Sequence, residues 1–218
     1  MGIAGGHWAA GPWRAASVEA VTNPRLLIMP GSPALVPELA PSHLPGRRLL
    51  AAVREYVGGA GFARAEIVGS RDERWRTGHE GSFAAWGAPQ VEVGGGRHLP
   101  ELVARYALGG ALDVASSREH VAPLDPELLT VVVVDGPAGL TPRAPLSLVE
   151  GAREAHAALQ EFLAGRGRVD VDKLGAAGVI EPSLWGELAA LDVVRAELID
   201  SDDSLGVGSY VAAWEVRA

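Results

Sequence analysis

The sequence predicts a three-layer α/β fold, in which a mixed, mostly parallel central sheet is flanked by helices. Residues 130–134, TVVVV, are five β-favouring residues without polar alternation, which is typical of a strand covered on both faces. Other strand and helix candidates alternate along the chain, an order typical of parallel sheets. The last two strand candidates, residues 195–199 and 207–216, are close enough to pair antiparallel, so the sheet is expected to be mixed.

The first part of the chain is expected to hold two strands with a helix between them. Residues 25–29, RLLIM, form a short apolar strand that ends at the sequence PGSP. A helix is predicted over residues 46–57, before the glycine pair 58–59, because four apolar residues recur there at helical spacing: Leu49, Leu50, Val53 and Val57. Residues 64–68 are then predicted to form the second strand.

Residues 69–88 are expected to form a long loop that holds four aromatic or imidazole side chains: Trp75, His79, Phe83 and Trp86. Loops of this length inside a compact domain are usually functional or disordered, and the aromatic content favours function. One hypothesis is a surface for self-association, because aromatic residues are enriched at interface hot spots. A strand at 90–93, a helix at 99–108 and a weaker strand at 111–115 are predicted to follow.

The second part of the chain is expected to supply the other helices. A helix over residues 147–163 would place Leu148, Ala152, Ala155, Leu159 and Phe162 on its inner stripe. A shorter helix is predicted over residues 182–191. The acidic residues before the last strand, Asp200, Asp202 and Asp203, are read as a solvated hairpin turn, because the glycine and distal glutamate of a calcium-binding EF-hand loop are missing.

Composition limits the class of protein. The 218 residues predict one domain over residues 21–218, after a poorly ordered leader at 1–20. No apolar run is long enough to span a bilayer and no signal peptide is evident, so we expect a cytoplasmic protein without membrane partners. A net charge of −8 without a basic cluster argues against nucleic acid. The absence of cysteine excludes disulfides, thiolate nucleophiles and iron–sulfur clusters.

The loop after the central strand is the predicted binding site, because ligands of open α/β sheets bind beyond the carboxyl ends of the strands. Its polar candidates are Asp135, Thr141 and Arg143. Arg143 could hold a carboxylate through two parallel hydrogen bonds. The alternative is that Asp135 only caps the turn with a side-chain hydrogen bond.

Three blocks of sequence, in this order, resemble the class III extradiol ring-cleavage dioxygenase superfamily, which has the fold of the protocatechuate 4,5-dioxygenase β subunit. Residues 28–39, IMPGSPALVPEL, are similar to its opening strand and loop. The segment DGPAGLTPRAP, at 135–145, looks like the DGSA..T.KAP sequence of an actinobacterial branch. Residues 205–214, LGVGSYVAAW, are similar to its closing strand. The resemblance covers nearly everything after residue 20.

The resemblance implies an Fe(II) site of two histidines and a glutamate, with another histidine as acid or base. Carried over to this chain, the first ligand histidine is replaced by Ser32, and the acid/base position holds Gly139 or Leu140, neither of which moves a proton. His79 is the candidate for the second ligand. His43 is an alternative ligand histidine. The glutamate candidates are Glu197 and Glu215.

Two functions therefore remain open. The first is a catalytically altered member of this fold that acts as a scaffold or binds a small aromatic or carboxylate ligand, with no cofactor and with Ser32, Asp135, Thr141 and Arg143 as ligand-binding candidates. The second is an active Fe(II)-dependent extradiol dioxygenase, or another metal-dependent oxidoreductase, with a rearranged site that includes His79.

Overall fold

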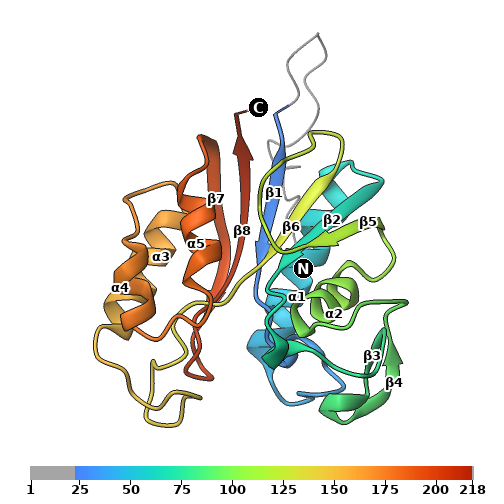
Figure 1. The fold of residues 1–218 in the computed structure, drawn as a ribbon, viewed down its shortest axis with the longest axis horizontal. Coiled ribbons are helices and arrows are strands. Elements are labelled where there is room, and N and C mark those ends of the chain that lie inside the picture. Colours follow the sequence, from blue (N-terminus) through green and yellow to red (C-terminus); the bar gives the residue numbers. More distant parts are fainter. Residues whose placement is uncertain (1–22, 218) are drawn as a thin grey trace, which may run out of the picture.

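The structure is a computed structural model and describes residues 23–217, so the predicted leader at 1–20 lies outside the described residues. A six-stranded sheet in the order β5-β2-β6-β1-β8-β7 forms the centre (Figure 1). Its strands β5, β2, β6 and β1 are parallel, and β8 is antiparallel to both of its neighbours. The predicted mixed, mostly parallel sheet is thus confirmed. The strand bounds are β1 Arg25–Met29, β2 Arg64–Gly69, β5 Asp113–Arg118, β6 Leu129–Val133, β7 Val193–Asp202 and β8 Ser209–Val216.

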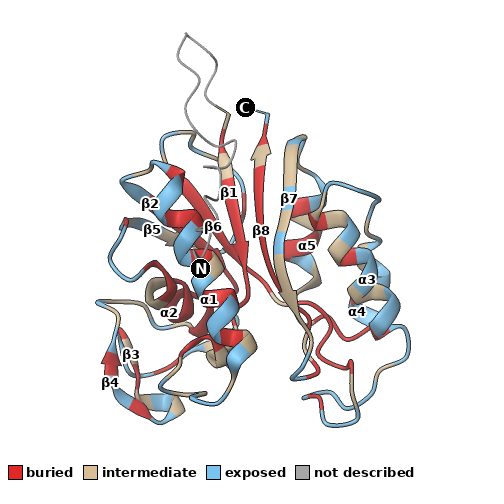
Figure 2. Ribbon diagram, turned by 180° about the vertical axis from the view of Figure 1, so that it is seen from behind, coloured by how far each residue is buried: buried red, intermediate tan, exposed pale blue. Residues whose placement is uncertain are grey.

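Helices cover both faces of this sheet, which makes the three predicted layers (Figures 1 and 2). Helices α1 (Leu44–Ala60) and α2 (Leu99–Leu108) pack on one face. On the other face lie α3 (Ala152–Leu163), α4 (Val171–Ala176) and α5 (Pro182–Ala189). The sequence reasoning missed α4, a helix of only six residues.

The valines of β6 and the next residue, Val134, divide between the two hydrophobic cores. Val131 and Val133 belong to the core under α1 and α2, whereas Val132 and Val134 belong to the core under α3 and α5. Because successive side chains of a strand point to opposite faces, an unbroken apolar run is what a strand between two cores requires. The prediction that this strand is covered on both faces is confirmed.

Three predicted helices differ from those observed at their ends, and the one predicted at 182–191 ends at Ala189. The helix predicted at 46–57 extends to Ala60, with the glycine pair inside it, and ends at Gly61, which has the left-handed φ of 76°. The helix predicted at 147–163 begins only at Ala152. Ser147 and Gly151 both have positive φ, 58° and 76°, so the backbone between them cannot be helical.

The strand predicted at 90–93 is observed at 88–92, as part of a small folded element after β2. Strand β4 (Ala88–Glu92) pairs with β3 (Ser82–Phe83) in a separate two-stranded sheet rather than joining the central one. Short 3₁₀ turns at Glu73–Trp75 and Ala84–Trp86 flank β3. The predicted long loop is therefore a folded excursion, which holds its aromatic residues in fixed places. Within residues 23–217, no helix has the length and apolar character needed to cross a membrane.

Candidate functional site

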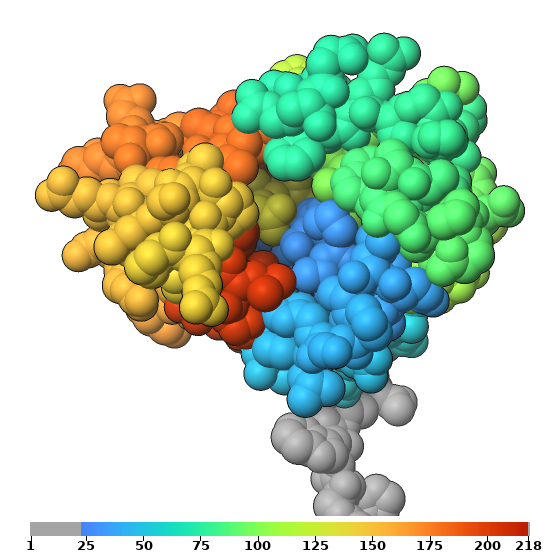
Figure 3. Space-filling model, turned by 90° about the horizontal axis from the view of Figure 1, so that it is seen from below, coloured from blue at the N-terminus to red at the C-terminus, as the bar shows by residue number. Residues whose placement is uncertain are grey.

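A cavity of about 340 Å³ lies at the carboxyl ends of β1 and β6. The two strands are neighbours, yet the chain leaves β1 toward α1 on one face and leaves β6 toward α3 on the other. Such a divergence opens a crevice where ligands bind in open α/β sheets. Seen from below, the molecule is hollowed there between blue, green, yellow and red segments (Figure 3). The wall is mainly apolar and includes Pro33, Leu99, Pro100, Val133, Val134 and Ile180.

The side chain of Asp135 lines this cavity directly after β6. The backbone N–H of Gly31 donates to both carboxyl oxygens, at 3.2 Å each. Burial raises the pKa of Asp135 to about 7, and the hydrogen bond from Gly31 offsets only part of that rise. The carboxyl group therefore changes its charge near neutral pH, so it can either donate or accept a hydrogen bond there.

The backbone around Asp135 is fixed on both sides. Trp185 Nε1 donates to the carbonyl oxygen of Asp135 at 3.0 Å, and the N–H of Gly136 donates to the carbonyl of Gly208 at 2.7 Å. The N–H of Val134 continues the ladder to Met29 at 3.0 Å. The carboxyl group consequently has a defined position without help from a bound molecule.

Two tryptophans from the excursion after β2 form part of the cavity wall. Trp75 Nε1 donates to Glu181 Oε1 at 3.0 Å, and both residues line the cavity. Trp86 also lines it and makes an edge-to-face contact with Phe83, with ring centroids 6.1 Å apart. The aromatic residues of this segment are therefore divided between the cavity wall and the core below it.

Behind the cavity floor lies a pair of polar side chains that the sequence reasoning missed. The hydroxyl of Tyr210 is 2.7 Å from His156 Nδ1, and the two rings stack with centroids 5.3 Å apart. Burial and the nearby Asp135 and Asp203 raise the pKa of Tyr210, while burial lowers the pKa of His156. From the sequence, His156 is expected to face solvent within the helix after the central loop, whereas the structure places it half-buried against Tyr210. A signal was present, since His156 falls on the helical stripe of Ala152, Leu159 and Leu163, which are buried.

The predicted polar residues are only partly brought together. Ser32 lines the cavity next to Asp135, although its hydroxyl accepts a hydrogen bond from the N–H of Ala34 at 3.2 Å and so caps a 3₁₀ turn. Thr141 and Arg143 are not among the lining residues; Arg143 is exposed and Thr141 lies against the turn at Gly206. The carboxylate-binding role predicted for Arg143 thus has no counterpart in the cavity.

The candidate metal ligands do not meet at the cavity. His79 is exposed, and its N–H donates to Thr77 Oγ1 at 3.0 Å. His43 directly precedes α1. Glu197 is exposed on β7, and Glu215 pairs with Arg25 at the opposite, amino-terminal end of β1. At the acid/base position, Gly139 and Leu140 are both buried and neither lines the cavity.

The residues at the cavity do not fit the Fe(II) site of the resembled family. No histidine lines the cavity, and the carboxylates there are Asp135 and Glu181. Nowhere in residues 23–217 do three or more His, Cys, Asp or Glu side chains gather as metal ligands would. This part of the chain therefore does not assemble two histidines and a glutamate around one position.

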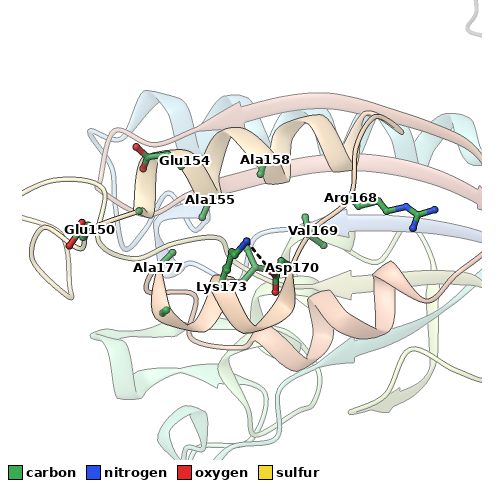
Figure 4. A pocket seen from close by; sticks show the side chains of 12 residues that line it. Glu150, Glu154, Ala155, Ala158, Arg168, Val169, Asp170, Lys173 and Ala177 are labelled. Carbon is green, nitrogen blue, oxygen red and sulfur yellow. Dashed lines mark ion pairs between the residues drawn. The ribbon is translucent and has the colours of Figure 1, made fainter.

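A second hollow, of about 490 Å³, lies between α3 and α4 (Figure 4). Its charged side chains, Glu150, Glu154, Arg168, Asp170 and Lys173, are all exposed. Lys173 pairs with Asp170 at 3.2 Å within this set. Because its charges are solvated and of both signs, this hollow has no buried polar group that would orient a ligand.

No protein-family model matches the chain, and a search of the curated proteins found no match either.

Proposed function

We propose that this protein binds a small, mainly apolar molecule in the cavity between β1 and β6, and that it does so without the iron chemistry of the dioxygenases it resembles. The observation that carries the proposal is the placement of Asp135. A preformed apolar cavity with one well-positioned buried polar group is the usual form of a small-molecule site.

The carboxyl group would orient the ligand, and the apolar wall would supply the binding energy. Gly31 and Trp185 already hold Asp135 in place, so the ligand need not order it. Pre-organisation of this kind increases affinity because less conformational freedom is lost on binding.

A fragment screen by ligand-observed NMR tests this proposal, with two tryptophan variants as probes of location. Val207 is half-buried and lines the cavity, so Val207→Trp should fill it and abolish binding. Val194, exposed on the edge strand β7, provides the control, and Val194→Trp should leave binding unchanged. Fragments that bind both variants equally would place the site elsewhere and contradict the proposal.

The alternative proposal is an active Fe(II)-dependent oxygenase with a rearranged site. Its support is the pair of carboxylates at the cavity, Asp135 and Glu181, together with the resemblance. It predicts stoichiometric iron in anaerobically purified protein and catechol-dependent oxygen uptake. Protein that binds fragments in the cavity yet holds no iron would favour the first proposal.

A further inference from the structure

We infer that the natural ligand of the cavity is a small organic cation, with a protonated amine or quaternary ammonium group attached to an apolar body. The inference rests on the proposed function and adds the chemical class of the ligand. It is carried by the charges, the indole rings and the apolar surface that line one cavity.

The charged residues that line the cavity are both acidic. They are Asp135, which follows β6, and Glu181, which precedes α5; no lysine, arginine or histidine lines it. A catecholate or carboxylate ligand would therefore bring negative charge toward two carboxyl groups with no basic side chain to offset it. The negative charge of the cavity lining therefore disfavours anionic ligands and favours cationic ones.

Neither carboxyl group has a strong ion-pair partner among the described residues. The side-chain oxygens of Asp135 accept hydrogen bonds from the neutral Gly31 N–H, and Glu181 accepts one from the indole of Trp75. Arg74 lies near enough to Glu181 to interact with its charge, but the Arg74 guanidinium pairs with Asp72 at 2.9 Å. A partly buried carboxylate is stabilised by a positive charge, and here the ligand would supply it.

The rest of the wall distinguishes an organic cation from a metal ion. Trp75 and Trp86 present indoles, the side chains that attract cations most strongly. The apolar wall can enclose a hydrocarbon body. Calcium would instead require six to eight oxygen ligands, which two carboxylates in a largely apolar wall do not provide.

Binding of a cation should also depend on pH. Because burial raises the pKa of Asp135 to about 7, its carboxyl is largely neutral below that pH, and a bound cation favours the ionised form. The other titratable groups near it are Tyr210 and His156 behind the floor, and Glu181 with Arg74 at the wall. Affinity for a cation should therefore rise between about pH 6 and pH 8.

The test uses three probes of the same size that differ in charge: benzylamine, benzyl alcohol and benzoate. Titration calorimetry of the full chain at pH 8 should give at least tenfold tighter binding of benzylamine than of the other two. Asp135→Asn keeps the side-chain shape and an oxygen for Gly31, and should weaken benzylamine binding about tenfold to a hundredfold. The same substitution should weaken benzyl alcohol binding much less, so the preference for benzylamine over benzyl alcohol should fall. Glu181→Gln keeps the acceptor for Trp75. It should likewise weaken the binding of benzylamine more than that of benzyl alcohol.

The possible outcomes separate the inference from the proposed function. If benzyl alcohol or benzoate binds as tightly as benzylamine, and Val207→Trp abolishes that binding, the cavity binds ligands but the cation inference is overturned. If benzylamine does not bind, the inference is also overturned, while the fragment screen decides the proposed function separately. Benzylamine binding that Val207→Trp leaves intact would show a cation site elsewhere and would overturn the inference, while the fragment screen again decides the proposed function.

Discussion

The position of Asp135 in the cavity could be predicted from the sequence, whereas the positions of its neighbours in the loop could not. Its position after an unbroken apolar strand predicts that it lies at the carboxyl edge of the sheet, and the structure places it there. Thr141 and Arg143 look equally suitable in the sequence, but the loop turns away after Ala138 and carries them out of the cavity. The direction of an irregular loop depends on contacts with distant segments, here the turn at Gly206, and local sequence does not encode these contacts.

The raised pKa of Asp135 predicts a pH-dependent stability. The folded protein binds the proton more tightly than the unfolded chain, whose carboxyl has a pKa near 3.8. Asp135 therefore disfavours unfolding most below about pH 4, and this contribution is lost as the pH rises to about 7. The free energy of unfolding of Asp135→Asn, relative to that of the natural protein, should accordingly increase by a few kcal/mol between pH 4 and pH 8. Urea denaturation at both pH values measures this, and an unchanged difference would refute the assigned pKa.

Gly136 is required by the packing of Tyr210. A Cβ added at Gly136 would lie 2.5 Å from the hydroxyl oxygen of Tyr210, which is itself fixed by His156. Gly136→Ala should lower the free energy of unfolding by about 1–3 kcal/mol, because the fully buried tyrosine has no room to move. In Gly58→Ala, a helical site with open space, stability should instead rise by up to about 1 kcal/mol. Thermal denaturation compares the two, and equal effects would argue against the close packing.

At the scale of elements, strong periodicity predicted which helices and strands exist, but it predicted the residues at which they begin and end less well. The helix at 99–108 is correct to the residue, because Pro100 opens it and Gly109, with a φ of 57°, ends it. The helix after the central loop was extended too far toward its start, because nothing local marks a positive φ at Ser147. The strand predicted at 90–93 exists at 88–92, but the sequence did not indicate its partner, since pairing partners are set by tertiary contacts.

An ion pair that connects three neighbouring strands should stabilise the sheet. Arg118 of β5 donates to both oxygens of Glu66 on β2, at 3.0 and 2.5 Å, and Thr130 of β6 donates to the same carboxylate at 3.0 Å. Arg118→Met leaves the buried Glu66 without its cation, so the free energy of unfolding should fall by about 3–5 kcal/mol.

The control for this ion pair is an exposed one. Arg166 pairs with Glu161 at 2.6 Å, but both side chains are more than half exposed, so Arg166→Met should cost about 1 kcal/mol or less. Equilibrium denaturation in urea compares the two variants. A similar small loss in both would show that the inter-strand pair contributes no more than a surface pair.

At the scale of the whole molecule, the two cores lie on opposite faces of the same central strands. Leu27 and Ile28 of β1, adjacent in the chain, lie in different cores on opposite faces. Neither core can persist without the sheet that separates them. The chain from 23 to 217 is therefore expected to unfold as one cooperative unit.

This expectation is tested by following two signals through one denaturation. Far-ultraviolet circular dichroism reports the whole secondary structure, and tryptophan fluorescence includes the fully buried Trp185 and Trp214 of one core. The two transitions should coincide. A separate fluorescence transition would mean that part of the molecule unfolds by itself.

The place of β8 in the sheet has a consequence for synthesis. This strand, the last in sequence of the central sheet, lies between β1, the first, and β7. During synthesis on the ribosome, β1 cannot pair with β8 until a segment nearly two hundred residues later in the sequence has been made (Arg25 pairs with Glu215). Until residues 209–216 emerge, one edge of β1 stays unpaired and open to other strands. The nascent chain should thus depend on chaperones until its final strand is complete.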